Sequence, residues 1–186
     1  CIFTDWRAER FVTGGDGATV KLLCLETGVE LLEFDLHTDA VNCLAVDWTS
    51  QHVLSGDDNG ALMLWNLHGG ELVRLLLADP FEVTDPHHRH VETQVNCVAL
   101  DWPSRRALSG HRDAILRVWD VDTGTVVHLL QGHTGQVVSL VADWAGARAI
   151  TGSRDCTLRL WNLESAEVVQ VLKGHGSNVV SLAMPS

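Results

Sequence analysis

The sequence lacks the features that would place the chain in a membrane or outside the cell. It contains no run of 18 apolar residues, so no membrane-spanning helix and no membrane insertion are expected. Residues 1–6 do not join a basic stretch to an apolar one, as a secretion signal does. They also include no initiator Met, so we expect the natural N-terminus to lie upstream. No N-x-S/T glycosylation acceptor occurs. These absences predict an intracellular, cytoplasmic protein.

Positive charge is scarce. The 13 Lys and Arg residues face 24 Asp and Glu residues, which gives a formal net charge of −11 and a pI near 5.2. Nucleic acids and anionic membranes are bound mainly through Lys and Arg. The balance therefore predicts that the chain binds no nucleic acid and does not adhere to membranes.

Cysteine provides no metal clip. The five cysteines are odd in number, and no two form a C-x-x-C pair; they are Cys1, Cys24, Cys43, Cys97 and Cys156. We expect them to be small, free, buried residues in a reducing compartment. Walker A, H-E-x-x-H and EF-hand patterns are also absent, so no cofactor is predicted.

Tryptophan reveals an internal repeat. Trp6, Trp48, Trp102 and Trp144 each follow an Asp, and they are separated by 42, 54 and 42 residues. A second series has the last two of these steps, and it consists of Trp65, Trp119 and Trp161. The longer step is a normal period with 12 inserted residues, which lie within Leu77–Gln94. A repeat of this length indicates a propeller or a solenoid.

Each unit is predicted to form four short strands. In the second unit, residues 41–48, 52–55, 61–67 and 71–77 are rich in β-formers, and Gly, Asp and Asn separate the last three. No amphipathic stretch of ten or more residues supports a helical repeat. The expected fold class is therefore all-β.

These features resemble the WD-repeat (WD40) family. The resemblance rests on the period, on the Trp119–Asp120 pair, and on the pairs Gly132–His133 and Gly174–His175. It covers almost the whole chain and implies a β-propeller of four-stranded antiparallel blades. The approximate units are 1–40, 41–94 with an insertion at 77–94, 95–136, 137–178, and the start of a further unit at 179–186.

The resemblance also implies a structural tetrad of His, Ser or Thr, Asp and Trp in each blade. The fourth unit offers His133, Thr151 (or Ser153), Asp155 and Trp161. The third offers Ser109, Asp113 and Trp119 with an undecided His; the second offers His37, Ser55 and Trp65 with Asn59 at the Asp position. The first unit keeps Thr13, but Gly17 and Leu23 replace Asp and Trp. A Ser–His–Asp set also suggests a hydrolase triad. Because the set recurs with the repeat, we predict a structural role and no enzyme activity.

Two features are candidates for contact with a partner. The Asp–Trp pairs that end the first strand of each unit are expected to close the bottom edge of a blade, or else to present aromatics to a partner. The insertion is expected to share the top face with the turns at 56–60, 111–113 and 153–155. The predicted partner-binding residues there are His87, His88, Arg89, His90, Arg112 and Arg154. A solvated loop and a Zn or Cu site at the three histidines are the alternatives.

Four blades do not close a ring easily. Propellers have about 4–8 blades, and family rings with this repeat mostly use seven or eight. We expect this chain to be part of such a ring, completed by further blades, a second copy or other chains. The predicted function is a non-enzymatic scaffold that binds a protein or peptide on the top face. The alternatives are a structural subunit of a large assembly and, third, a His-loop metal protein.

Overall fold

The computed structural model describes residues 1–76 and 93–183, and in these ranges the regular structure is entirely β. The strands form four antiparallel sheets of four strands each. This confirms the predicted all-β class and the four-stranded blades. No helix in the described ranges is long and apolar enough to cross a membrane.

The four sheets, named blades 1 to 4, follow one another along the chain. Blade 1 contains β1 (Ile2–Asp5), β2 (Arg10–Gly14), β3 (Val20–Cys24) and β4 (Glu30–Phe34). Blade 2 contains β5 (Val41–Asp47), β6 (His52–Asp57), β7 (Leu62–Asn66) and β8 (Leu72–Leu76). Blade 3 contains β9 (Val95–Asp101), β10 (Arg106–His111), β11 (Leu116–Asp120) and β12 (Thr125–Leu130). Blade 4 contains β13 (Val137–Asp143), β14 (Arg148–Ser153), β15 (Thr157–Asn162) and β16 (Glu167–Lys173).

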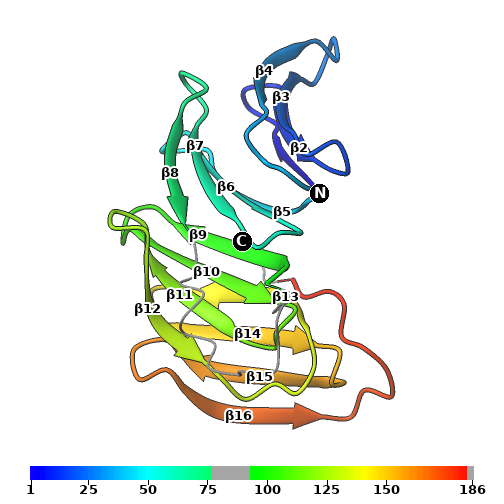
Figure 1. The fold of residues 1–186 in the computed structure, drawn as a ribbon, viewed down its shortest axis with the longest axis vertical. Helices are drawn as coiled ribbons and strands as arrows, with labels where there is room; N and C mark the ends of the chain where they lie inside the picture. The colour runs from blue at the N-terminus through cyan, green and yellow to red at the C-terminus, as the bar shows by residue number, and fades with distance from the viewer. Residues whose placement is uncertain (77–92, 184–186) are drawn as a thin grey trace.

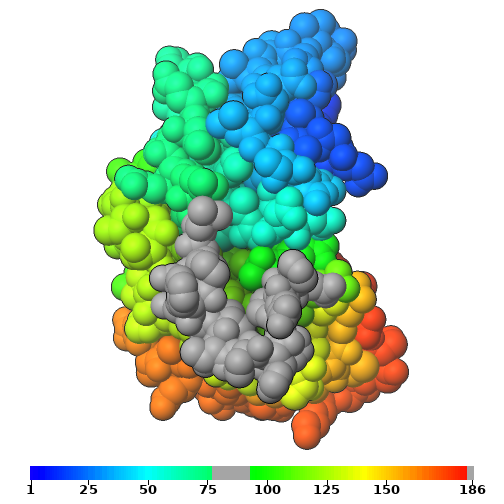
Figure 2. All heavy atoms as spheres, in the orientation of Figure 1, coloured from blue at the N-terminus to red at the C-terminus, as the bar shows by residue number. Residues whose placement is uncertain are grey.

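The blades succeed one another as an arc. In each sheet the strands lie in chain order, so the first strand forms one edge and the fourth forms the other. Figure 1 shows the sheets following one another from blade 1 in blue to blade 4 in yellow and orange. Figure 2 shows blade 1 at one end of the molecule and the orange part of blade 4 at the opposite end. Blades 1 and 4 therefore each have a neighbouring blade on one side alone.

The same irregularity marks the third strand of every blade. The pairing between the third and fourth strands shifts register next to Leu23, Trp65, Trp119 and Trp161, which occupy one repeat position. Such a bulge re-aims a side chain in an otherwise regular ladder. In blades 2 to 4 the residue at the shift is a tryptophan at most 1% exposed.

The apolar core lies between blades. One cluster joins Val12 and Leu22 of blade 1 to Val53 and Trp65 of blade 2. Two further clusters join blade 2 to blade 3 and blade 3 to blade 4 in the same manner. Each interior blade therefore buries its apolar side chains against both neighbours, which is the pattern of a stacked repeat.

A short contact, which we call the blade joint, recurs at each junction. A glycine near the end of the second strand lies beneath the valine that opens the next blade. In blade 3, a β-carbon built on Gly110 would lie 2.6 Å from Cys97 Sγ and 2.6 Å from Val137 Cγ1. Equivalent contacts occur at Gly14, Gly56 and Gly152, where the valines are Val41, Val95 and Val179; at Gly152 the oxygen of Ser139 takes the place of the cysteine sulfur. The joint therefore has no room for a side chain at the glycine.

Candidate functional site

In blade 4 the structure brings together the four residues that the resemblance implied. The Trp161 indole N–H donates to Thr151 Oγ1 at 2.7 Å. Thr151 Oγ1 lies 2.8 Å from His133 Nε2, and His133 Nδ1 lies 2.7 Å from Asp155 Oδ2. Ser153, the alternative to Thr151, instead donates to the carbonyl of Gly135. We call such an arrangement a buried polar chain.

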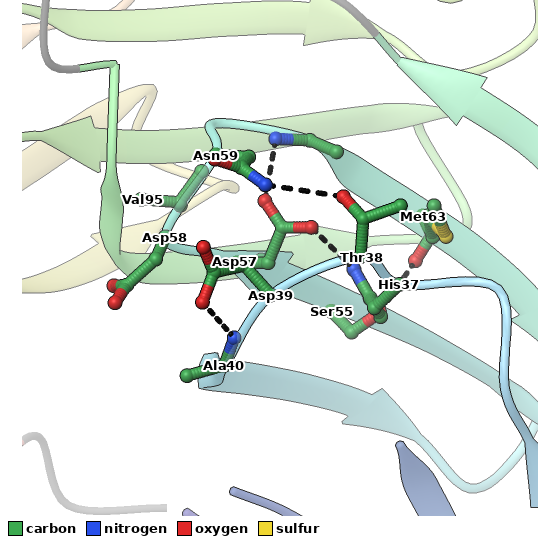
Figure 3. A network of polar contacts seen from close by, with 12 residues as sticks. His37, Thr38, Asp39, Ala40, Ser55, Asp57, Asp58, Asn59, Met63 and Val95 are labelled. Atoms are coloured by element: carbon green, nitrogen blue, oxygen red, sulfur yellow. Dashed lines mark hydrogen bonds and ion pairs between the residues drawn. The ribbon is translucent and has the colours of Figure 1, made fainter. Parts of the chain in front are cut away.

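Blade 2 contains the same chain with a different acid. Trp65 Nε1 donates to Ser55 Oγ at 2.8 Å, and Ser55 Oγ lies 2.6 Å from His37 Nε2. The carboxylate that faces His37 Nδ1, at 2.8 Å, belongs to Asp57 (Figure 3). The assignment of Asn59 to this place was therefore wrong. Asp57 ends strand β6 beside His37, whereas Asn59 lies further along the turn and donates to Thr38 Oγ1.

Blade 3 obtains its histidine from its own second strand. Trp119 Nε1 donates to Ser109 Oγ at 2.7 Å, and Ser109 Oγ lies 2.7 Å from Nε2 of His111, which ends β10. His111 Nδ1 lies 2.8 Å from the carbonyl oxygen of Thr93, so it donates its proton there. The sequence left this histidine undecided, and His111 fills the role from a different repeat position than His37 and His133.

The assignment of Asp113 to this chain was wrong. Its carboxylate accepts two hydrogen bonds from the Arg117 guanidinium, at 2.6 and 3.3 Å, and one from the Ile115 N–H. Arg117 is 2% exposed, so its charge needs a partner in the interior. Asp113 thus pairs with Arg117, and the Thr93 carbonyl faces His111 Nδ1 in place of an acid.

These sets have the connectivity of a hydrolytic triad without its accessibility. In blade 2 the order is Ser55, His37, Asp57, but Ser55 and Asp57 are 0% exposed. The Ser55 oxygen also accepts the indole proton of Trp65, which leaves no open side for a substrate. A nucleophile must reach a substrate atom, so this geometry supports the structural interpretation.

The titration of His111 predicts a pH-dependent stability. Burial, and then the positive charge of Arg117, lower the pKa of His111 from 6.5 to about 4. Between these values the unfolded chain binds a proton that the folded chain does not, so the free energy of unfolding falls as pH drops below about 6.5. Urea unfolding at pH 7 and pH 5 measures this loss. We expect the His111→Gln variant to lose less stability over that interval than the unaltered protein; an equal loss would contradict the assignment.

The Asp–Trp pairs close the bottom edge, which is the end of each blade with the turn between its first and second strands. Trp48, Trp102 and Trp144 are partly buried and pack against the core clusters of the preceding junctions. The carboxylates order the turns, because Asp5, Asp47 and Asp143 each accept a backbone N–H from the turn that follows, whereas Asp101 accepts the Ser104 hydroxyl. Trp6 has no preceding blade in this chain and is 77% exposed.

The predicted partner-binding residues are divided between two parts of the chain. His87, His88, Arg89 and His90 lie outside the described residues. Arg112 and Arg154 lie on the turns after β10 and β14, at the same repeat position, and both are exposed. Their backbone N–H groups donate to the carbonyls of Gln94 and Gln136, which come just before the first strands of their blades. This holds both arginines at the inner part of the top face. In the described ranges, no group of three or more His, Cys, Asp or Glu residues could hold a metal ion.

The described cysteines are free thiols that differ in exposure. Cys43 and Cys97 occupy one repeat position beside the blade joint, and burial raises the pKa of Cys43 well above its usual value and that of Cys97 to about 12. Cys43 is buried, Cys24, Cys97 and Cys156 are partly exposed, and Cys1 is exposed, so the expectation that the cysteines are buried was wrong for all but Cys43.

This difference predicts selective thiol reactivity. The thiolate is the reactive form, so Cys43 and Cys97 should resist Ellman's reagent at pH 8 in the folded protein. They should react only after denaturant is added, whereas Cys1 should react at once. Absorbance of the released thionitrobenzoate measures both phases, and rapid reaction of all the thiols in the folded chain would contradict the prediction.

The comparison with known families agrees with this architecture. The family model described as "WD domain, G-beta repeat" matches residues 28–66, 82–120 and 124–162, which together exceed half of the chain. The chain belongs to the WD40 family. Each match ends one residue after a buried tryptophan, at Asn66, Asp120 or Asn162. Each match therefore ends on the third strand of a blade. The first and third matches begin just before the last strand of the preceding blade, at residues 28 and 124, whereas the second begins in the insertion, outside the described residues.

Curated relatives share the repeat over part of their length. The chain is 30% identical over 105 residues to autophagy-related protein 16 of Arabidopsis thaliana, covering 56% of the chain and 18% of that protein. It is 27% identical over 173 residues to the angio-associated migratory cell protein of Homo sapiens, covering 76% of the chain and 40% of that protein. Mitochondrial division protein 1 of Eremothecium gossypii is 25% identical over 153 residues, with coverages of 69% and 20%. The chain thus spans less than half the length of these relatives.

A solved structure shows the same fold. The computationally designed protein Ika8 superposes with a TM-score of 0.78 at 24% sequence identity. The match covers 99% of this chain and 51% of that protein. All four blades of this chain therefore fit within about half of another protein of this fold.

Proposed function

We propose that this chain is a non-enzymatic scaffold that binds a protein or peptide on its top face. The top face is the end of the blades that carries the turns between their second and third strands. The proposal further places the chain within a propeller ring of seven or eight blades, in the cytoplasm. Free thiols support a reducing compartment, and the match of all four blades to about half of the Ika8 chain supports a larger ring.

The observation that carries the proposal is a change in the sign of the side-chain charge, from blade to blade, at one repeat position of the top face. This position holds Asp16 in blade 1, Asp58 in blade 2, Arg112 in blade 3 and Arg154 in blade 4, and all four residues are exposed. The repeat keeps the backbone alike while the charge changes sign between blades 2 and 3. A surface that is held rigidly and varied in this way suits recognition, because complementary charges set specificity and orientation.

Hydrogen bonds connect the two halves of this surface. The Gln94 side-chain amide donates to Asp58 Oδ1, and its oxygen accepts from Arg112 Nη1 at 3.3 Å. Asn42 also donates to Asp58. The side chains at the change of sign are therefore positioned before any partner arrives, which lowers the cost of ordering them on binding.

Peptide binding tests the proposal. A random peptide library should yield ligands for the purified chain, and the Arg154→Glu variant should bind peptides that carry an acidic end about ten-fold more weakly. Arg74→Glu, which makes the same change on strand β8 away from the top face, is the matched control. Fluorescence anisotropy measures the affinities. A failure to select any ligand, or an equal effect of the two variants, would contradict top-face binding.

A structural subunit of a large assembly is the second candidate. It is favoured by apolar side chains exposed on the fourth strands of the blades, among them Leu31 at 51%, Val73 at 42% and Val169 at 59%. Exposed apolar patches of this kind mark contact surfaces. If the chain is soluble only together with another subunit or with further blades, this second function is supported in place of the first.

A further inference from the structure

Blades 3 and 4 carry an arginine at the same position of their third strands. Arg117 of β11 and Arg159 of β15 are separated by 42 residues, which is one repeat. In blade 3 the Arg117 guanidinium donates to both carboxylate oxygens of Asp113, at 2.6 and 3.3 Å. This two-point contact matches the planar fork of a guanidinium to a carboxylate. A carboxylate is therefore the partner that this position of the repeat accepts.

Blade 4 has the equivalent acid, but its oxygens are already occupied. Asp155 Oδ2 accepts from the Thr134 N–H at 3.0 Å and lies 2.7 Å from His133 Nδ1. Asp155 Oδ1 accepts from the N–H and the hydroxyl of Thr157, at 2.9 and 2.7 Å. A carboxylate offers about four lone-pair sites, so Asp155 has none left for Arg159. The histidine of blade 4 thus takes the acid that pairs with the arginine in blade 3.

Arg159 consequently forms no ion pair in the described ranges. Its Nε is buried without a hydrogen-bond partner. A β-carbon built on Gly132 would lie 2.8 Å from Arg159 Nη1, and 3.4 Å from Trp161 and from Val168. The guanidinium therefore lies beneath the connection between β12 and β13, beside apolar side chains. A charge in such surroundings is poorly hydrated and is stabilised strongly by a paired anion.

The position of Arg159 does not depend on how the ring continues beyond blade 4. Arg159 and Trp161 point to the same side of β15, because alternate residues of a strand share a face. Trp161 packs in the cluster between blades 3 and 4, so this side faces blade 3. Arg159 is partly exposed there. A further blade on the other side of blade 4 leaves this place open.

A second cation lies at the same connection. Arg154 is exposed on the turn after β14, and its N–H donates to the Gln136 carbonyl at 2.9 Å. A β-carbon built on Gly135 would lie 3.1 Å from the Arg154 carbonyl carbon. Arg154 likewise forms no ion pair within the described part of the chain. Two unpaired cations on a chain of net charge −11 predict an acidic occupant.

We propose that Arg154 and Arg159 bind two carboxylates of an acidic segment in a partner protein. The inference rests on the proposed top-face binding and names the chemistry of its ligand. Arg159 holds one carboxylate through two hydrogen bonds, as Arg117 holds Asp113 in blade 3. Arg154 holds the next carboxylate from the surface. The contact at Arg159 supplies the specificity, because a bidentate pair demands one geometry and is shielded from water.

A capped peptide of four glutamates is the probe, and a capped peptide of four glutamines is its matched control. NMR of the arginine Nε–H groups in the ¹⁵N-labelled chain is the measurement. The glutamate peptide should shift the signals of Arg154 and Arg159, and the signal of Arg117 should stay in place because Asp113 already pairs with it. The glutamine peptide should bind at least about ten-fold more weakly. Equal binding of the two peptides, or shifts at Arg154 alone, would overturn the proposal.

Substitutions at Arg159 separate the planar fork from the charge. Arg159→Gln should weaken binding of the glutamate peptide about ten-fold, and Arg159→Lys about three- to five-fold, because an ammonium group makes no two-point contact. Arg148→Gln removes an equal charge at the bottom end of the same blade and should leave the affinity unchanged. If Arg159→Lys bound as tightly as the unaltered chain, the bidentate contact would be refuted. The comparison of the two peptides requires no variant, so it remains decisive even where Arg159→Gln is unfolded.

The failure of this inference differs from the failure of top-face binding. Peptides from the random library that depend on Arg154 but bind equally to Arg159→Gln would preserve top-face binding and overturn the acidic site. A chain that binds neither library peptides nor the glutamate peptide would overturn both.

Discussion

Replacing Gly110 with alanine is expected to lower the free energy of unfolding by about 3 kcal/mol, at the upper end of overpacking costs. The new β-carbon would lie 2.6 Å from both Cys97 Sγ and Val137 Cγ1. Neither atom can move far, because Val137 is 0% exposed at the start of β13 and Cys97 lies within β9. Urea denaturation followed by tryptophan fluorescence measures the change.

Two variants test the cause of this loss. Gly15→Ala, at a position with no heavy atom within 4 Å of the added carbon, should change stability by less than about 0.5 kcal/mol. The double variant Gly110→Ala, Cys97→Ala removes one of the two clashing atoms and should recover part of the loss. If Gly110→Ala were as stable as Gly15→Ala, the blade joint would not be the tight contact described.

Ser55→Ala is expected to cost about 2–4 kcal/mol, since it leaves two buried groups without their partner. The Trp65 indole N–H would lose its acceptor, and His37 Nε2 would lose the hydroxyl at 2.6 Å. Thermal and urea unfolding measure the loss. Ser165→Ala, on the exposed turn after β15, is the matched control and should be nearly neutral.

A double-mutant cycle identifies the partner responsible. In a Trp65→Phe background the indole donor is absent, so Ser55→Ala should cost at least about 1 kcal/mol less than in the unaltered chain. Equal costs in the two backgrounds would mean that Ser55 stabilises blade 2 by some other contact. The same cycle separates a structural serine from a nucleophile, because a catalytic role predicts no such coupling in stability.

The fold could be predicted because it depends on features that repeat. The spacing of the seven tryptophans and the short β-rich runs between turns determined the number and strand content of the blades. A periodic sequence repeats each physical requirement in every unit. A misassigned strand in one unit can therefore be recognised by comparison with the equivalent residues of the other units. The position of the insertion followed from the same reasoning, since the gap between Leu76 and Val95 is the one that departs from the period.

The buried polar chains were less predictable, because spacing identifies an equivalent backbone position and not the atom that reaches a partner. Asn59 occupies the repeat position of Asp155, yet Asp57, two residues earlier, reaches His37 Nδ1. His111 was visible as the residue two positions after Ser109, but nothing in the repeat required a histidine there. Side-chain reach across a turn decides both cases. The histidines of the insertion lie outside the described residues, and their role in binding stays a prediction.

The source of the histidine in blade 3 has a consequence for how this chain could change over evolution. In blades 2 and 4 the connection that enters the blade must deliver His37 or His133 to a fixed point, so its length is constrained. In blade 3 the strand supplies His111 itself and needs from the connection only the Thr93 carbonyl. That connection therefore does not have to position a histidine, as the connections into blades 2 and 4 do. Among the connections that join the described blades, it is the one that does not have to position a buried histidine, so a change in its length is expected to leave the fold of blade 3 intact.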